Sequence, residues 1–511
     1  MRNNNTNKPI NPKNKRELIV ITKKEYGIRS LNNTMKSVRN KDISNLNKLL
    51  QDENIEMLPL YFDNDNQTKR MLADIEPNAR DDTTDLANYY YIPAPDERVD
   101  DLITQLNDQD EVEVAYVKPR AELPLERIIL ENRSERSNLP LFLPDQLSET
   151  TPHFINRQIY LNPAPEGVDA YYAWKVPGGT GNGIRIIDLE AGWNFNHQDL
   201  KENQGGVISG INWEYDYHGT SVIGIISGDK NSFGITGISP DANISAVSIY
   251  QNPEIPTSRA ITIAANKLGK GDIILLEMHR PGPRHNFQER GDQEGYIGIE
   301  WWADDFKAIQ YAVNRGIIVV EAAGNGGENL DDDIYNINPA SPEGPFPSWW
   351  KNPFKRNPLD SGALIVGAGA PPPGTHEQNH GPDRSRLGFS NFGNCVDTQG
   401  WGREVTTTGG RSPPDSGIPD LNDLFAGDGP NQWYTDIFAG TSSASPIVTG
   451  VVACIQGIVR AKDKNPINPF KMRDILRNTG SPQQEAQGRP VSQRIGNRPN
   501  LKQIIEEEEE L

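Results

Sequence analysis

Gly440-Thr-Ser-Ser-Ala-Ser-Pro446 leads into the apolar run 447–459, and this stretch decides the fold of the larger part of the chain. The run predicts a buried helix, and Ser442 stands at its start. A serine hydroxyl there lies beside free backbone amides and the positive end of the helix dipole, although most such serines are simple helix caps. The hydroxyl becomes a nucleophile only with a base within reach and a carboxylate that orients the base. A catalytic role therefore requires both elsewhere in the chain.

Two earlier segments supply an acid and a base. Ile186-Ile-Asp188-Leu-Glu-Ala-Gly192 ends a buried strand, and His218-Gly-Thr-Ser-Val-Ile-Gly224 begins a helix of small residues. An acid at the carboxyl end of a parallel strand lies where α/β sheets place their sites. The chain thus offers Asp188, His218 and Ser442, in that order, on three separate elements. Each residue alone has an ordinary structural explanation, but the ordered set predicts a catalytic triad.

Around these segments, short apolar strands alternate with helical segments. The predicted strands are 184–187, 244–249, 273–276, 317–320 and 364–366, and the predicted helices between them are 219–226, 258–268 and 301–314. Buried strands with helical crossovers predict a doubly wound parallel α/β sheet with helices on both faces.

A second, smaller unit is predicted ahead of this sheet. Strand and helix patterns over 17–119 follow the order β, α, β, β, α, β, which indicates a ferredoxin-like α/β module. We expect 1–16 to be disordered, 120–165 to be a Pro-rich linker, 166–505 to be the large domain and 506–511 to be a solvated acidic tail.

The three segments around the triad resemble the signature blocks of the subtilase (subtilisin-like) family of serine proteases, over about residues 165–505. In the run Ile317-Ile-Val-Val-Glu-Ala-Ala-Gly-Asn325, the last residue resembles the family's oxyanion-hole asparagine. The resemblance implies a serine endopeptidase that forms an acyl-enzyme. Ser442 would attack, His218 would accept its proton, Asp188 would orient His218 and Asn325 would stabilise the oxyanion.

The resemblance also implies a role for the N-terminal module. It would be a propeptide-like intramolecular inhibitor whose end, 112–119, enters the cleft, with cleavage, including self-processing, in the 120–165 linker. The alternative is a catalytically silent subtilase fold that binds peptides or regulates other proteins.

Several residues depart from the family pattern. Leu189 and Glu190 follow Asp188 where small residues are usual, and Glu277-Met-His279 replaces a Ser-Leu-Gly edge. We expect His279 to crowd the cleft or to block strand pairing by a peptide. Glu277 and Glu321 either favour basic substrate side chains or have a structural role, and the sequence does not decide between the two.

No cofactor is required for this chemistry, but a structural calcium ion is an expectation. Asp199 with Asn231 resembles the family's calcium site. Calcium takes six to eight oxygen ligands, many of them backbone carbonyls, so two side chains also fit a turn-forming pair.

Composition narrows the partners. The formal net charge of −19 disfavours nucleic acid and anionic membranes as partners. The family resemblance implies a peptide or protein substrate as the partner. The two cysteines, Cys395 and Cys454, form no disulfide framework or zinc motif. The N-terminus shows no apolar signal region, so a cytoplasmic location is the default expectation, with secretion by another route left open.

Overall fold

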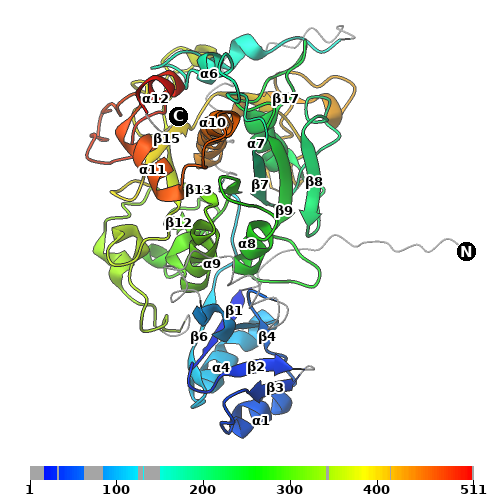
Figure 1. The fold of residues 1–511 in the computed structure, drawn as a ribbon, viewed down its shortest axis with the longest axis vertical. Coiled ribbons are helices and arrows are strands. Elements are labelled where there is room, and N and C mark those ends of the chain that lie inside the picture. The colour runs from blue at the N-terminus through cyan, green and yellow to red at the C-terminus, as the bar shows by residue number, and fades with distance from the viewer. Residues whose placement is uncertain are drawn as a thin grey trace, which may run out of the picture.

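The computed structural model describes residues 16–31, 34–62, 84–124, 131, 150–340, 344–414 and 416–508. These residues form a small N-terminal module, blue in Figure 1, below a larger domain coloured from green to red. The chain passes from the module into the centre of the larger domain after β6. The segments 1–15, 125–130 and 132–149, which include nearly all of the predicted disordered start and part of the predicted linker, lie outside the described residues.

The larger domain is built on a sheet of seven parallel strands among the described residues, in the order β15-β14-β13-β10-β7-β9-β8. The strands are β7 Arg185–Glu190, β8 Gln204–Ser209, β9 Asn243–Ser248, β10 Ile273–Leu276, β13 Ile318–Ala322, β14 Leu364–Gly369 and β15 Thr398–Trp401. The five predicted strands are confirmed in its centre. The two edge strands, β8 and β15, were not predicted because their sequences are polar and rich in glycine, without an apolar run.

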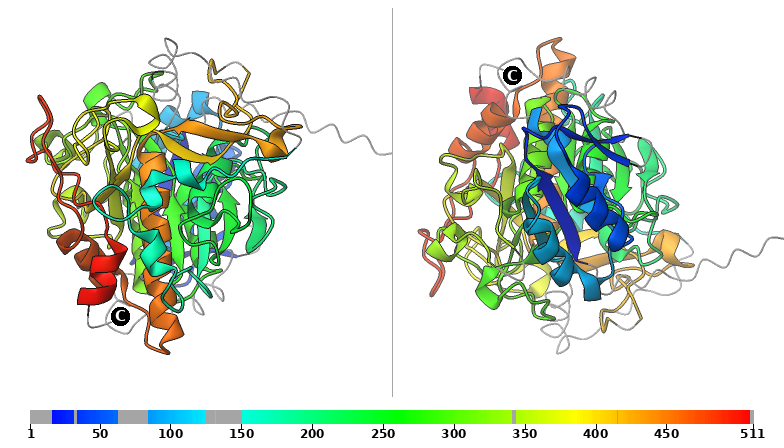
Figure 2. Two further views of the ribbon diagram at one scale, coloured as in Figure 1. Left: turned by 90° about the horizontal axis from the view of Figure 1, so that it is seen from above. Right: turned by 90° about the horizontal axis from the view of Figure 1, so that it is seen from below.

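Helices cover both faces of this sheet, as predicted. On one face lie α7 (Tyr217–Ser227) and α10 (Thr441–Ala461), and on the other lie α8 (Thr257–Ala265) and α9 (Ala303–Asn314). Figure 2 shows α10, in orange, lying across the sheet. This helix is long and apolar enough to cross a membrane, but its apolar window is wholly buried in the domain. We therefore interpret α10 as the central core helix.

Shorter elements complete the larger domain. They are α6 Ala170–Ala173, α11 Pro469–Asn478, α12 Leu501–Glu507, and the strand pairs β11 His279–Pro281 with β12 Tyr296–Gly298 and β16 Val405–Thr408 with β17 Tyr434–Phe438. The last of these helices includes the first two residues of the predicted acidic tail, and Glu506 accepts a hydrogen bond from Tyr172 Oη at 3.0 Å. Both cysteines are buried and free.

The N-terminal module has the predicted α/β topology. Its antiparallel sheet has the order β4-β5-β1-β6. The elements are β1 Glu17–Thr22, β2 Ile28–Leu31, β3 Thr34–Ser37, α1 Ser44–Asp52, β4 Leu58–Pro59, β5 Tyr89–Ile92, α4 Asp96–Asn107 and β6 Val112–Lys118. The order along the sheet is that of a ferredoxin-like module, because β1, the first of these four strands in the chain, lies between β5 and β6, the third and the fourth.

The central strand β1 is buried on both faces. Leu18 and Val20 pack in the module's own core with α1 and α4. Ile19 and Ile21, which point to the opposite face, belong to the same apolar cluster as α8 and α9 of the larger domain. The module's sheet is therefore covered on one side by its own helices and on the other by the larger domain.

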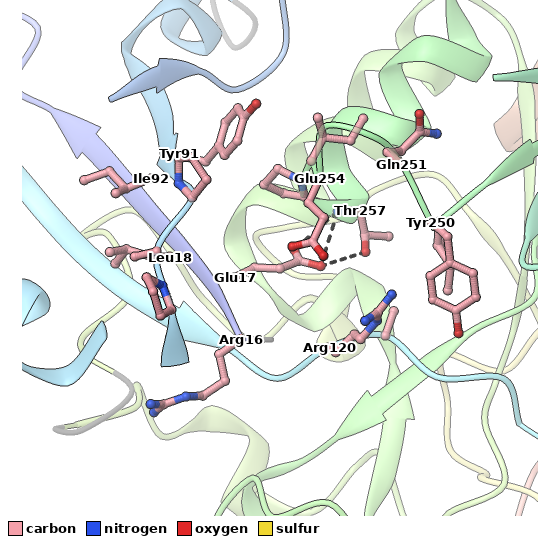
Figure 3. Close-up of a pocket in the computed structure, with 17 residues that line it drawn as sticks. Arg16, Glu17, Leu18, Tyr91, Ile92, Arg120, Tyr250, Gln251, Glu254 and Thr257 are labelled. Atoms are coloured by element: carbon pink, nitrogen blue, oxygen red, sulfur yellow. Dashed lines mark hydrogen bonds between the residues drawn. The ribbon is translucent and has the colours of Figure 1, made fainter. Parts of the chain in front are cut away.

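Buried charges also join the two parts. Lys118 Nζ lies 2.5 Å from Asp304 and 2.7 Å from Asp305, both in the first turn of α9, and 3.0 Å from Glu17. Arg280 contacts Glu17 and Asp305. We call these five residues the interface ion cluster. Glu17 in turn accepts a hydrogen bond from Thr257 Oγ1 at 3.0 Å at the start of α8, as Figure 3 shows.

Candidate active site

The carboxyl end of β7 carries two acids on one face. The strand runs to Glu190, three residues beyond the predicted end at 187. Side chains alternate along a strand, so Asp188 and Glu190, two residues apart, point the same way. Both side chains are fully buried. The longer strand places Glu190, rather than Asp188, at the end of the sheet.

His218 pairs with Glu190. The ring Nδ1 of His218, in the first turn of α7, makes a short hydrogen bond to Glu190 Oε2. Asp188 makes no such bond to His218 and instead accepts one from Trp193 Nε1 at 2.7 Å. The prediction that Asp188 orients His218 is therefore corrected: the structure puts Glu190 in that position, because β7 ends later than the apolar pattern indicated.

Asp188 and Glu190 form a carboxyl pair. Neither Asp188 Oδ1 nor Glu190 Oε1 has a hydrogen-bond partner among the described residues. Burial and the neighbouring Glu190 raise the pKa of Asp188 well above its usual value, and burial raises the pKa of Glu190 to about 8, although the nearby Asp188 carboxyl lowers it in part. A protonated Asp188 that donates to Glu190 satisfies both oxygens.

His218 and Ser442, the predicted base and nucleophile, are both fully buried. Within the described part of the chain, neither His218 Nε2 nor Ser442 Oγ has a hydrogen-bond partner. Burial lowers the pKa of His218 to about 3, so the ring is neutral near pH 7 and one nitrogen can accept a proton. Its ring packs edge-on against Phe438 at 5.6 Å between centroids. Ser442 lies in the first turn of α10, as predicted.

Asn325 is held as an oxyanion-hole donor would be. Its Oδ1 accepts hydrogen bonds from the backbone N and the Oγ1 of Thr441, both at 2.9 Å, which leaves Nδ2 as the donor of the amide. That Nδ2 makes a short hydrogen bond to the carbonyl oxygen of Pro124. A Cβ on Gly440 would lie 3.0 Å from the same oxygen, so the glycine there permits the close approach. The amide thus points at a peptide carbonyl beside the nucleophile.

The carbonyl belongs to a segment that runs along the predicted substrate cleft. We call residues 121–124 the cleft segment. The Glu122 backbone pairs with His279 as an antiparallel bridge, with both N–H to O hydrogen bonds at 3.0 Å. The expectation that His279 blocks strand pairing is wrong, because pairing uses only backbone atoms and the imidazole packs on the ring of Tyr296, 4.7 Å between centroids.

The cleft segment also corrects the predicted end of the module. We expected 112–119 in the cleft, but residues 112–118 form β6 inside the module's sheet. The chain leaves the module past Arg120, whose guanidinium lies 4.5 Å from the centre of the Tyr250 ring at the pocket in Figure 3. It then enters the cleft with Ala121.

Two residues that the sequence did not single out hold the cleft segment. Tyr296 Oη donates to Glu122 Oε1 at 2.9 Å, and Gln293 Nε2 donates to the carbonyl oxygen of Leu123 at 3.0 Å. Both lie at the β11–β12 hairpin, which follows directly from the unusual His279 edge. The unusual sequence Glu277-Met-His279 indicated that this edge of the site differs from the family pattern. It did not show which residues would contact the cleft segment.

Glu277 and Glu321 have structural surroundings. Glu277 Oε1 makes a short hydrogen bond with Ser445 Oγ, which also lies 2.7 Å from the carbonyl of Thr441. One hydroxyl proton cannot serve two acceptors, whereas a protonated Glu277 satisfies both contacts. Burial raises the pKa of Glu277 well above its usual value, although Ser442 and Ser445 lower it in part. Ser442 is thus close to Glu277 without meeting hydrogen-bond geometry.

The other acid, Glu321, is also buried, and it lies near a second acid, Glu300. Glu321 Oε1 accepts from Glu300 N at 3.2 Å, and burial together with the Glu300 charge raises the pKa of Glu321 well above the usual value. Both carboxyls are fully buried and hydrogen-bonded within the fold, so the structure favours the structural interpretation. We call Asp188, Glu190 and Glu277 the active-site carboxyl cluster.

Asp199 and Asn231 come together, but as a hydrogen-bonded pair. Asp199 accepts from Asn231 Nδ2 at 2.7 Å, from Ile235 N at 2.7 Å and from Tyr434 Oη at 2.8 Å. The oxygen of the Asn231 amide accepts from Phe233 N at 2.9 Å. N–H and O–H donors around a carboxylate do not fit a cation, which requires oxygen lone pairs. No cluster of three metal-ligating acids, histidines or cysteines occurs in the described ranges.

Comparison with known proteins agrees with this geometry. The family model described as "Subtilase family" matches residues 182–497. Thermitase of Thermoactinomyces vulgaris is 26% identical over 343 residues, covering 64% of this chain and 90% of thermitase. The intracellular serine protease of Paenibacillus polymyxa is 23% identical over 354 residues, 65% of this chain and 87% of that protein.

Two solved structures share the fold of nearly the whole chain. The epidermin leader peptide processing serine protease of Staphylococcus aureus has a TM-score of 0.53 at 16% identity, over 96% of this chain and 99% of that one. Fervidolysin of Fervidobacterium pennivorans also has a TM-score of 0.53 at 16% identity, over 97% of this chain and 61% of that one. At this identity they establish the fold alone.

Proposed function

The chain belongs to the subtilase family of serine peptidases, and from that premise we propose that it is an endopeptidase whose triad is Glu190, His218 and Ser442. The hydrogen bond between His218 Nδ1 and Glu190 carries this proposal. Glu190 fixes the tautomer that leaves Nε2 free to accept a proton, and Asn325 supplies the oxyanion donor. The small residues Ala191 and Gly192 follow Glu190, as the family pattern expects after the triad acid.

The proposed reaction is acyl transfer. Ser442 Oγ forms a bond to the carbonyl carbon while His218 Nε2 takes the hydroxyl proton, and the carbonyl electrons move to an oxyanion held by Asn325. The C–N bond then breaks, and His218 gives its proton to the leaving amine. Water, activated by His218, hydrolyses the ester. Glu190 stabilises the imidazolium most when ionised, and opening the cleft to water lowers its pKa towards that state.

We propose further that the N-terminal module is an intramolecular inhibitor that the enzyme removes itself. The cleft segment supports this, because its strand pairing and its carbonyl at Asn325 occupy the place of a substrate. The module's sheet on α8 and α9 holds that segment in place. The pairing of Glu122 with His279 also removes the main reason for favouring the catalytically silent alternative.

Peptide cleavage and active-site labelling test the proposed triad. We expect a fluorophosphonate to add once to the chain, as measured by intact mass, and not to Ser442→Ala. Glu190→Gln presents the wrong hydrogen-bonding group to His218 and should lower kcat by roughly 10⁴-fold. Asp188→Asn imitates a protonated Asp188 and is the matched control, with a much smaller loss expected. Equal losses in the two variants, or a larger loss in Asp188→Asn, would overturn the assignment.

We keep the cytoplasmic location as a proposal. Two relatives are named as intracellular serine proteases, those of Paenibacillus polymyxa and Bacillus subtilis. Fractionation of source cells with an antibody to the peptidase domain tests it, and recovery of the protein from the medium of intact cells would refute it.

A further inference from the structure

The cleft segment assigns positions to the residues before a scissile bond. Asn325 holds the carbonyl of Pro124, so Pro124 is the residue whose carbonyl Ser442 would attack. Counting back, Leu123 and Glu122 are the second and third residues before the bond. Glu122 is the residue that pairs through its backbone with His279, and Ala121, only 2% exposed, lies before it. This segment thus lies in the cleft in the direction and register of a substrate.

The side chain of Glu122 has a specific donor in the cleft. Tyr296 Oη donates to its carboxylate at 2.9 Å, and the same Tyr296 oxygen accepts from the backbone N of Arg290 at 3.0 Å. That second bond fixes the hydroxyl so that its one proton points to the carboxylate. A hydrogen bond to a charged acceptor is stronger than one to a neutral group. The ring of Tyr296 is also held in place, because it is buried and packs on His279.

We propose that this peptidase selects peptides with a carboxylate three residues before the cleaved bond, which Tyr296 recognises, and that it cleaves its own chain after Pro124. The inference rests on the function proposed above and adds a substrate class to it. Gln293 holds the second carbonyl before the bond through its side-chain amide, a contact that does not depend on the substrate's side chains. We therefore assign discrimination between substrates to the side chain at the position of Glu122, the third residue before the bond.

The overall charge of the chain would favour the opposite preference, so the two explanations can be told apart. A net charge of −19 attracts basic peptides and repels acidic ones. Selection by the long-range field predicts a preference for lysine at this position, whereas selection by Tyr296 predicts a preference for glutamate. Glu277 and Glu321 do not change this contrast, because both are fully buried and hydrogen-bonded within the fold.

The test compares three fluorogenic peptides that differ only at this position. The probes carry Ala-Glu-Leu-Pro, Ala-Gln-Leu-Pro or Ala-Lys-Leu-Pro before the reporter, and the enzyme is the full chain after self-processing is complete. We expect kcat/KM for the Glu peptide to exceed that for the Gln peptide by roughly ten- to hundredfold. Tyr296→Phe should reduce this ratio to near one. Tyr171→Phe, on α6 outside the cleft, is the matched control and should keep it.

Other outcomes decide between the two proposals. A Glu-to-Gln ratio near one in the unmodified enzyme, or a Lys peptide cleaved faster, overturns the selection by Tyr296. A ratio that Tyr296→Phe does not change also overturns it. The mass of the released N-terminal piece should correspond to residues 1–124, and a first cut at another bond contradicts the register. If fluorophosphonate does not label Ser442 at all, the proposed function itself fails. Labelled enzyme without the preference contradicts only this inference.

Discussion

Two buried clusters of carboxyl groups lie in this molecule, and they are stabilised in opposite ways. The interface ion cluster sets three carboxylates against Lys118 and Arg280, two cations that are fully buried with them. The active-site carboxyl cluster has, among the described residues, one basic side chain in hydrogen-bond contact, His218, and burial favours its neutral ring. Cations offset the burial of the first cluster, fully for Glu17 but only in part for Asp305, whose pKa burial raises to about 6. Bound protons neutralise the second cluster. A buried acid can therefore report either a strong ion pair or a bound proton, depending on its neighbours.

The pKa values of one acid in each cluster show the contrast. Burial raises the pKa of Glu17, but Arg280 and Lys118 outweigh burial and lower it to about 2. Burial raises the pKa of Glu190 to about 8, with no cation to offset it. The first acid should stay ionised at any ordinary pH, and the second should titrate near neutrality.

Removing the central cation of the interface should have the largest effect. In Lys118→Met, made in the inactive Ser442→Ala chain, three carboxylates lose their shared partner. Breaking a buried ion pair costs about 3–5 kcal/mol, so the free energy of unfolding should fall by that amount. Urea unfolding followed by tryptophan fluorescence measures it. The control is Lys36→Met at an exposed position of β3, and equal stability of the two variants would contradict the ion cluster's importance.

The two clusters should contribute to stability in different pH ranges. Glu190 binds its proton more tightly folded than unfolded, so its contribution to stability is lost as pH rises from 4.5 towards 8. Glu17 binds its proton less tightly folded, so its contribution is lost as pH falls from 4.5 towards 2. A tenfold difference in proton affinity between the folded and unfolded chain corresponds to about 1.4 kcal/mol of stability. In a plot of unfolding free energy against pH, Glu190→Gln should reduce only the slope above pH 4.5, and Glu17→Gln only the slope below pH 4.5. The reverse result would refute these assignments of the two acids.

A smaller loss should follow from the one indole donor in the carboxyl cluster. Trp193→Phe removes the N–H that Asp188 accepts and leaves Asp188 Oδ2 buried without a partner. The expected cost is about 1–3 kcal/mol, because a buried polar atom keeps its desolvation penalty. Thermal unfolding measures this loss. An increase in stability would show that the indole bond strains the site rather than supports it.

Removal of calcium should have the smallest effect. The donors around Asp199 leave it no role as a cation ligand in this arrangement, so a metal chelator should not change the melting temperature measurably. Differential scanning fluorimetry with and without added calcium measures this. A rise on adding calcium, lost in Asp199→Asn, would restore the calcium site that the family resemblance implies.

The sequence predicted the frame of the molecule better than its site. The five central strands and the four main helices were recognisable because their residues are buried and apolar over whole runs. The choice between Asp188 and Glu190 could not be predicted in this way, because it depends on where β7 ends. Charged residues usually follow a buried strand, so the two acids inside β7 predict an earlier end than the strand has. The small residues Ala191 and Gly192 after Glu190 were an available signal that pointed to the second acid.

The cleft segment could not be predicted, for a physical reason. Its pairing with His279 joins backbone atoms of residues far apart in the sequence, and such pairing depends little on side-chain identity. The position of Tyr296 opposite Glu122 depends on the hairpin geometry, which no local pattern specifies. Ser442, His218 and Asn325 were predictable because they stand in short motifs at the ends of strands and helices.

The two-sided burial of β1 has a practical consequence for making this protein. Ile19 and Ile21 cover an apolar surface on α8 and α9, so a gene shortened to start near residue 150 would encode a domain with that surface bare. Bare apolar surfaces of this kind drive aggregation. Recombinant production of the peptidase domain should therefore begin from the whole reading frame, or supply the module as a second polypeptide in the same cell.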